Sequence, residues 1–178
     1  MGEVKQMAGS VAERARREAE AYGGDEPRPL SGYVAILSVY TAVVTLAAAV
    51  AATSGRRLPD RWQIQDLITV TLGSYKLSRT LSKDAVTSPI RAPFTYYAGT
   101  AGPAEVHEET RHSSQLRHSL GELLTCPFCL DMWVATAFVI GSIFVPRLTR
   151  LVAGGLSALA GADFLQLAYT KAQQAAEG

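Results

Sequence analysis

One stretch of this chain carries no charged residue from Pro29 to Gly55, and it constrains the fold more than any other feature. Its core, Tyr33 to Ser54, is apolar on every side, with Arg28 before it and Arg56 and Arg57 after it. About 20 apolar residues cross the hydrocarbon core of a bilayer, whereas a buried helix of a soluble protein is rarely apolar all round. Residues 1–28 precede the run, which argues against a signal peptide. The stretch predicts a membrane-spanning helix.

Three further segments extend this prediction to an all-α integral membrane bundle of about four transmembrane helices. The chain then has a polar, cytoplasmic N-terminal helical segment, a helical membrane domain with a Pro-rich central loop, and a short tail. The expected bounds are 1–28 for the N-terminal segment, 29–172 for the membrane domain, 85–118 for the loop and 173–178 for the tail, with spans at about 32–54, 62–82, 121–145 and 150–170. Only "PRLTR" links the last two spans, so they should form an antiparallel hairpin.

The segment at 62–82 is amphipathic rather than uniformly apolar. Its polar positions recur at helical spacing on one side and its apolar residues fill the rest. The polar positions are Asp66, Thr69, Gly73, Lys76 and Thr80. The segment can span with this stripe turned inward, or it can lie in the membrane interface.

The central loop contains prolines at 89, 93 and 103, which exclude a continuous helix. Irregular backbone cannot face lipid, so the loop should dock on the helix ends. Ile90, Phe94, Tyr96 and Tyr97 are the expected apolar anchor, and Arg91 is expected to hold a lipid phosphate or a helix C-terminus.

The distribution of lysine and arginine predicts the orientation. With four spans, one side collects twelve of these residues from both termini and the central loop, and the other side collects five. Both termini and the loop are therefore predicted to be cytoplasmic.

Composition narrows the function classes. A net charge of +1 with no concentrated basic face argues against nucleic-acid binding. Signatures of nucleotide-binding loops, zinc proteases and serine hydrolases are absent from the sequence. The chain offers little to suggest an enzyme.

The only two cysteines, Cys126 and Cys129, stand at the start of the third span. A helix N-terminus favours a thiolate, as in thiol redox proteins, but a single C-x-x-C is a weak signal. A zinc site needs about four ligands, and His112 and His118, with His107, lie just upstream. Packing or reduced thiols, a zinc site and a redox pair all stay open, with packing favoured and no cofactor expected.

Ionisable groups within spans are costly unless they are paired or hydrated. Asp66 lies too far along its helix from Lys76 and Arg79 to pair with them, so its partner should come from another helix. Asp163 of the fourth span is expected to meet the Lys76/Arg79 region. These groups form either packing ion pairs or an ion or proton pathway.

Small residues repeat every four positions on two faces of the fourth span. One face has Ala153, Ser157 and Gly161, and the other has Gly154, Ala158 and Ala162. Such faces let helix backbones approach closely in lipid. They predict packing within the bundle or a homo-oligomer, and they name no protein partner.

Two stretches together, "LSRTLSKDAVTSPIRAPFT" and "GELLTCPFCLDMWVA", resemble the domain-of-unknown-function 1360 family of small bacterial multi-pass membrane proteins. The residues that carry the resemblance are Lys83, Asp84, Ser88, Pro89, Arg91, Ala92, Pro93, Phe94, Cys126, Cys129 and Trp133. The family often has a small residue where this chain has Asp131. The resemblance implies an integral protein of a bacterial cell membrane and brings no activity.

Three functional hypotheses follow. The leading one is a non-enzymatic membrane protein that acts in structure, assembly or interaction, with membrane lipid around it. The first alternative is a thiol-redox or metal-binding protein using Cys126 and Cys129. The second is a small ion or proton conductor that uses the charges of the spans.

Overall fold

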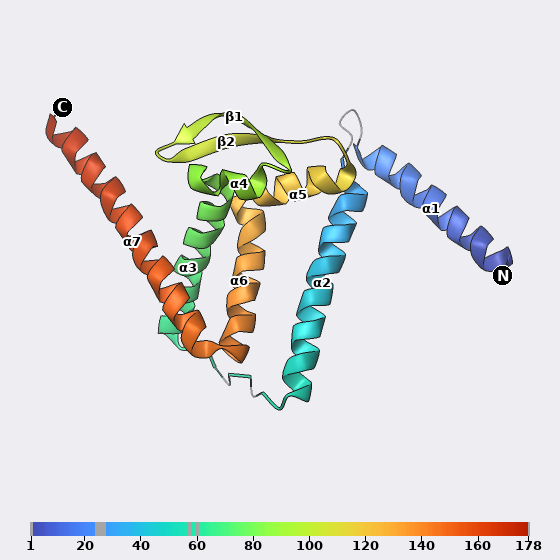
Figure 1. The fold of residues 1–178 in the computed structure, drawn as a ribbon, viewed down its shortest axis with the longest axis horizontal. Helices are drawn as coiled ribbons and strands as arrows, with labels where there is room; N and C mark the ends of the chain where they lie inside the picture. The colour runs from blue at the N-terminus through green and yellow to red at the C-terminus, as the bar shows by residue number, and fades with distance from the viewer. Residues whose placement is uncertain (1, 24–27, 57, 60, 178) are drawn as a thin grey trace.

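The computed structural model describes residues 2–23, 28–56, 58–59 and 61–177. Most of this part of the chain is helical, with one small sheet (Figure 1). In chain order the elements are α1 (Gly2–Gly23), α2 (Leu30–Thr53), α3 (Ile64–Lys83), a 3₁₀ turn η1 (Ala85–Thr87), α4 (Ser88–Arg91), β1 (Thr95–Gly102), β2 (Glu105–Thr110), α5 (Gln115–Thr125), α6 (Pro127–Phe144) and α7 (Pro146–Glu177).

Within the described residues, three helices are long and apolar enough to cross a membrane, namely α2, α6 and α7. The polar stripe of α3 keeps this helix outside that group, although it packs along α6 and α7. The start of α2, the hairpin β1–β2 and the end of α7 lie on one side of the bundle (Figure 1). The end of α2, the start of α3 and the α6–α7 turn lie on the other side.

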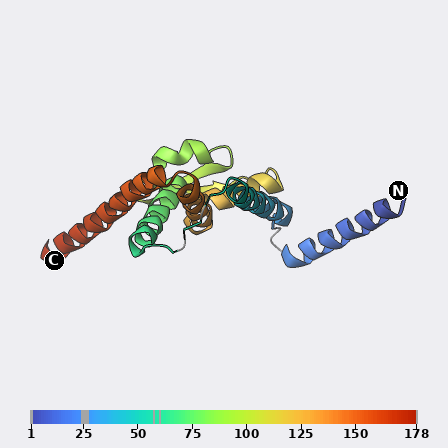
Figure 2. The same cartoon turned by 90° about the horizontal axis from the view of Figure 1, so that it is seen from below.

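The packed core lies among α3, α6 and α7, which gather together while α2 stands beside α5 (Figure 2). Leu130, Val134 and Phe138 of α6 meet Ala153 of α7 there. Gly73 of α3 allows this contact, because a Cβ at that position would lie 3.1 Å from the carbonyl oxygen of Ala153. Small residues on α3 and α7 thus bring the two backbones close, as small faces do in membrane helices.

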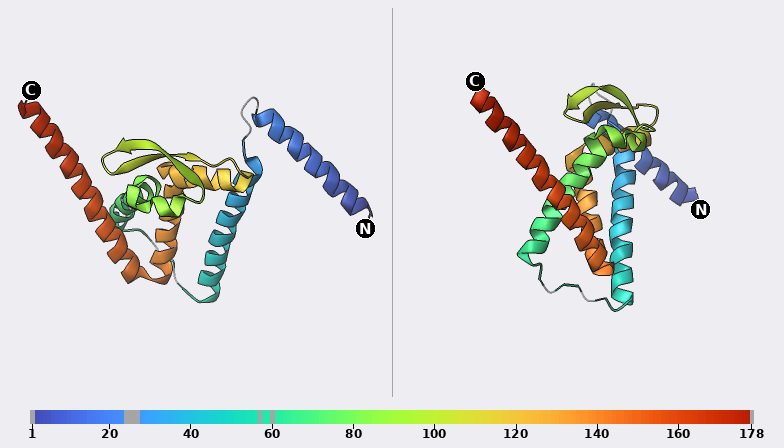
Figure 3. Two further views of the ribbon diagram at one scale, coloured as in Figure 1. Left: turned by 45° about the horizontal axis from the view of Figure 1, so that its top comes forward. Right: turned by 60° about the vertical axis from the view of Figure 1, so that its left-hand side comes forward.

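Helix α5 lies across the upper ends of α2 and α6 and connects them (Figure 3). Gly32 of α2 is buried against α5, where an added Cβ would lie 2.5 Å from the carbonyl oxygen of Gln115. Ser119 Oγ donates a hydrogen bond to the carbonyl oxygen of Pro29 at 3.2 Å. Helix α2 has more extensive contacts with α5 than with α6, so these contacts at its N-terminal end help to attach it to the bundle.

The prediction of a purely helical protein with an irregular loop at 85–118 is wrong in part. This region contains η1, α4 and an antiparallel hairpin in which Thr95 pairs with Thr110 and Gly102 with Glu105. The turn places Ala104 at a positive φ of 62°. An isolated two-stranded hairpin is marginal in water, so contacts with α3 and α5 must hold it.

The bounds of the last two spans also differ from the prediction. The segment expected at 121–145 breaks at Cys126 into α5 and α6, because Pro127 lacks an N–H and forces the preceding residue out of the helical region. The link "PRLTR" and most of the expected tail belong to α7, which runs to Glu177. The antiparallel α6–α7 hairpin therefore turns at Val145.

Candidate functional site

The cysteines occupy the corner between α5 and α6. Cys126 has φ −100° and ψ 105°, so it ends α5 and caps α6. Its Sγ accepts a hydrogen bond from the backbone N–H of Cys129 at 3.2 Å, in the manner of a serine N-cap. Both thiols are free, with Cys126 half-buried and Cys129 exposed. The local role of Cys126 is therefore helix capping, which agrees with a packing role at a helix start.

These cysteines line a groove between α2, α5 and the first half of α6, with a volume of about 530 Å³. Its wall is largely apolar and aromatic. Tyr40 meets Trp133 edge to face, with ring centroids 5.1 Å apart, and its hydroxyl lies 2.8 Å from Thr136 Oγ1. The residues of the wall are Tyr33, Ile36, Leu37, Tyr40, Ser119, Glu122, Leu123, Thr125, Cys126, Cys129, Met132 and Trp133.

A cluster of charged and polar side chains lies beside this groove, with the Glu122 carboxylate at its centre. Arg28 Nη1 and His118 Nε2 each lie 3.5 Å from Glu122 Oε1, and the Tyr33 hydroxyl donates to Oε2. The His112 and His118 rings also touch, with centroids 4.2 Å apart. Of this cluster, Tyr33 and Glu122 line the groove, while Arg28 and His118 lie beside Glu122.

The residues considered for zinc do not come together as a ligand set. No group of three or more His, Cys, Asp or Glu residues that could hold a metal ion occurs within residues 2–23, 28–56, 58–59 and 61–177. His118 contacts Glu122 and His112, while the cysteines face the groove. The thiol and metal hypotheses stay predictions.

The charges of α3 are paired with other elements. Lys76 Nζ lies 2.7 Å from Asp163 Oδ2 of α7, which is the contact expected between Asp163 and the Lys76/Arg79 region. Arg79 instead holds Glu105 of β2 through two hydrogen bonds of 2.7 and 2.9 Å. These pairs connect α3 to both α7 and the hairpin.

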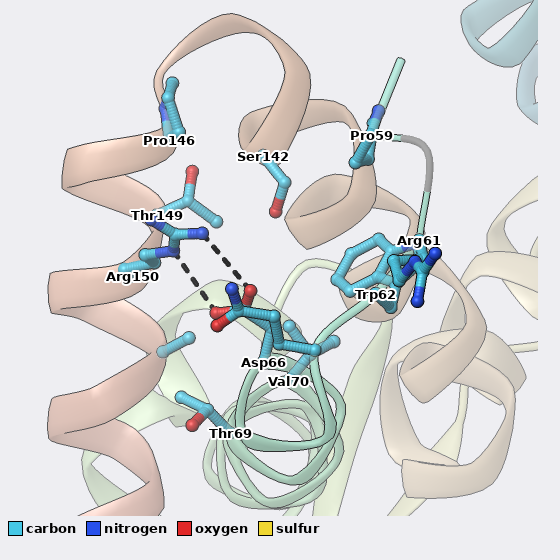
Figure 4. Close-up of a pocket in the computed structure, with 12 residues that line it drawn as sticks. Pro59, Arg61, Trp62, Asp66, Thr69, Val70, Ser142, Pro146, Thr149 and Arg150 are labelled. Atoms are coloured by element: carbon cyan, nitrogen blue, oxygen red, sulfur yellow. Dashed lines mark hydrogen bonds and ion pairs between the residues drawn. The ribbon is translucent and has the colours of Figure 1, made fainter.

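Asp66 has its partner on α7, as expected of a residue that needs another helix. Arg150 Nε and Nη2 each donate to its carboxylate at 3.2 Å (Figure 4). The pair faces a pocket of about 130 Å³, across which Trp62 and Arg61 lie. Ser157 Oγ adds a hydrogen bond of 2.7 Å to the carbonyl oxygen of Thr69. The polar stripe of α3 therefore faces α7.

Among the residues that carry the family resemblance, Arg91 makes the most side-chain hydrogen bonds, and it is fully buried. Its guanidinium binds Glu108 through Nε at 2.6 Å and Nη2 at 3.2 Å. It also donates to the carbonyl oxygens of Leu81 at 2.7 Å and Asp84 at 3.0 Å. These carbonyls lie at the end of α3, so Arg91 caps that helix and is not available for a lipid phosphate.

The other motif residues surround Arg91. Ser88 Oγ accepts from Arg91 Nη2 at 3.2 Å, and Pro89 lies in the first turn of α4. Asp84 caps α3 and forms an isolated bridge with Glu105, while Lys83 is the last residue of α3. Pro93 follows α4 and is exposed. The motif thus builds the turn that joins α3 to the hairpin.

The ionisation of Glu108 reflects this environment. Burial alone would raise its pKa, but hydrogen bonds from Arg91 and Ser88 and the guanidinium charge outweigh that effect, and the pKa of Glu108 lies below its ordinary value. The expected anchor residues Ile90, Tyr96 and Tyr97 are largely exposed instead. Phe94, the fourth expected anchor residue, is half-buried, and the polar contacts of Arg91 hold the loop on the end of α3.

Several partners of the predicted residues were not foreseen from the sequence. They are Tyr33, Glu105, Glu108, Glu122 and Arg150. Only Glu122 had a local signal, since it stands four residues after His118 on the same helix face. The others depend on contacts between distant segments.

A comparison with protein-family models matches residues 69–169 to the family described as "Protein of unknown function (DUF1360)". The match covers more than half of the chain and includes the Arg91 turn, the cysteine corner and the core of α3, α6 and α7. It confirms the resemblance seen in the sequence. No curated protein and no solved structure matches the chain.

Proposed function

The chain belongs to the DUF1360 family of proteins of unknown function, and on this premise we propose that it is a non-enzymatic, four-span membrane protein that assembles with copies of itself. The proposal has two parts, which are a fourth span formed by α3 and a self-association face on α7. Each part has its own support and its own test.

The support for α3 as a span is that two of its charged residues are paired with residues of α7. Lys76 pairs with Asp163 and Asp66 with Arg150, both across the α3–α7 contact. The opposite side of α3 exposes Ile64, Leu67 and Ile68, which suit a lipid boundary. Paired charges of this kind favour a packing role over an ion pathway.

With four spans, both termini and the hairpin lie at one membrane face, and the excess of lysine and arginine there supports a cytoplasmic location. The cell membrane of a bacterium is part of the same proposal. A reporter that is active only in the cytoplasm tests this orientation. It should be active when fused after residue 178 and inactive when inserted after Leu58. Activity at both positions would contradict the α3 span.

The single observation that carries self-assembly is the unoccupied small face of α7. Ala153 and Ser157 on the other face are used by α3. On the second face, by contrast, an added Cβ at Gly154 would meet nothing within 4 Å, and Ala158 and Ala162 are exposed. Glycine in a helix interior costs up to about 1 kcal/mol relative to alanine. Close approach of another helix in lipid would offset this cost.

The test is energy transfer between labelled copies in vesicles, measured as the protein-to-lipid ratio falls. Ala158→Leu should reduce transfer to the level of random mixing, because leucine prevents close backbone approach. Ala48→Leu, on the exposed face of α2, is the matched control and should leave transfer unchanged. Random-mixing transfer by the unaltered protein at all ratios would contradict self-assembly.

A further inference from the structure

The groove between α2, α5 and α6 has the length, position and chemistry of a lipid site. Its apolar wall, with Ile36, Leu37, Leu123, Met132 and Trp133, lies along the first half of α6. Its volume of about 530 Å³ falls within the range of about 300–1,000 Å³ typical of small-molecule sites. Two of its three lining helices, α2 and α6, are long and apolar enough to cross a membrane, which would bring its apolar wall to the depth of lipid chains.

Beyond the groove, the hollowed surface extends along α2 alone. A second, shallower hollow shares Leu37 and extends to Ala49. From Tyr33 to Ala49 an α-helix rises about 24 Å, compared with about 15 Å for one leaflet of hydrocarbon. The two hollows together therefore have enough length for one acyl chain.

The charged cluster stands at the end where a headgroup would lie. Arg28 precedes the first residue of α2, and Glu122 lies close to the end of α5. Their closest nitrogen–oxygen separation is 3.5 Å, and the two side chains are 48% and 29% exposed. The direct attraction across a pair this long and this exposed is weak, so a headgroup with both signs of charge adds a phosphate beside Arg28 and an ammonium beside Glu122 to the contacts that these side chains already make.

We propose that this groove binds one phospholipid whose headgroup carries a phosphate and a primary ammonium. Arg28 holds the phosphate and Glu122 accepts hydrogen bonds from the ammonium, with an acyl chain lying against Trp133 and Leu37. A carboxylate favours a primary ammonium over a trimethylammonium, because only the primary ammonium has N–H donors. This inference is independent of self-assembly through α7.

The two tryptophans of the chain permit a direct test. Trp133 lines this groove, and Trp62 lines the pocket beside Asp66 and Arg150. Trp62→Phe leaves Trp133 as the only tryptophan, and lipids with brominated acyl chains quench its fluorescence on contact. In phosphocholine vesicles, brominated phosphoethanolamine should quench Trp133 at a several-fold lower mole fraction than brominated phosphocholine. Trp133→Phe, which leaves Trp62, should show no such preference.

Two variants make the test specific. Glu122→Gln should abolish the headgroup preference while quenching by the chains continues. Leu37→Phe should narrow the groove and weaken quenching of Trp133, whereas Val43→Phe on the same helix, outside both hollows, should not. Leu37 is 60% exposed, so this variant tests the groove even if Glu122→Gln does not fold.

Two results would overturn the proposal. Equal quenching by both brominated lipids would mean that Trp133 meets only bulk lipid. No quenching in vesicles made entirely of brominated lipid would mean that protein, such as a second copy of the chain, covers the groove.

Discussion

Arg91 and Glu108 form a bidentate ion pair from which solvent is almost excluded, with the arginine side chain 0% and the glutamate side chain 6% exposed. Thr95 Oγ1 also lies 3.3 Å from Glu108 Oε2. Because Arg91 caps the end of α3 and Glu108 belongs to β2, this pair fixes the hairpin on the helix bundle. A buried pair is stabilising relative to either partner alone, since an unpaired buried charge is very costly.

We therefore expect Arg91→Lys to destabilise the protein although it keeps the charge. Lysine cannot reproduce the planar fork that reaches Glu108 and the carbonyl oxygens of Leu81 and Asp84 together. The expected loss is about 3 kcal/mol in reversible unfolding in mixed micelles. Arg117→Lys, at an exposed position of α5, is the matched control and should change stability by less than about 0.5 kcal/mol. Equal stability of both variants would mean that the pair does not hold the hairpin.

The same pair predicts a dependence of stability on pH. The pKa of Glu108 is lower in the folded protein than in the unfolded chain. Its contribution to stability is therefore complete above the unfolded pKa of about 4.3 and is lost as the pH falls through the lower, folded pKa. The difference in unfolding free energy between the unaltered protein and Glu108→Gln should shrink below about pH 4. A constant difference down to pH 2 would assign the stabilisation to another group.

The long apolar helices and one contact between helices could be predicted from sequence because local patterns determine them. A charge-free run of 27 positions from Pro29 to Gly55 leaves few soluble alternatives. The meeting of Asp163 with the Lys76 region followed from the rule that charges within spans need partners. The capping of a helix C-terminus by Arg91 was likewise one of two predicted roles.

The hairpin and the groove could not be predicted, because they depend on contacts between distant segments. The strands β1 and β2 contain glycines and charges that resemble a loop, and Arg91 stabilises them from a preceding turn. The break at Cys126 had a visible cause in Pro127, yet the apolar run on either side resembled one helix. Glu122 gains its neighbours only because α5 lies across the end of α2.

The packing of α2 on α5 includes a close backbone contact that can be tested at Gly32. An added Cβ would lie 2.5 Å from the carbonyl oxygen of Gln115, a backbone atom that cannot move without shifting α5. Gly32→Ala should therefore cost about 2 kcal/mol in unfolding. Gly155→Ala, outside both small faces of α7, is the control, because nothing lies within 4 Å of the new methyl group and alanine favours the helix. Tolerance of both substitutions would contradict the packing of α2 on α5.

Because Cys126 caps α6 through its side chain, its replacement by serine and by alanine should affect stability differently. Cys126→Ser keeps an acceptor for the N–H of Cys129 and should leave stability within about 0.5 kcal/mol, whereas Cys126→Ala removes the cap and should cost about 1 kcal/mol. The free energy of unfolding of both variants can be measured in micelles under reducing conditions. Metal analysis of the purified protein accompanies it, and stoichiometric zinc or iron that is lost in Cys126→Ser would replace the capping role with a metal site.

The pair of Lys76 and Asp163 decides between packing and conduction. Lys76 is 19% and Asp163 is 42% exposed, so we expect Asp163→Asn to cost only about 1 kcal/mol, well below the cost for a fully buried pair. Lys76→Met should cost a similar amount. If the role is packing, the double variant should cost less than the sum of the two, because neither charge is left alone. Ion and proton flux into vesicles should be the same for the unaltered protein and Asp163→Asn. A lower flux in Asp163→Asn, with the variant folded, would favour an ion or proton pathway through α3 and α7.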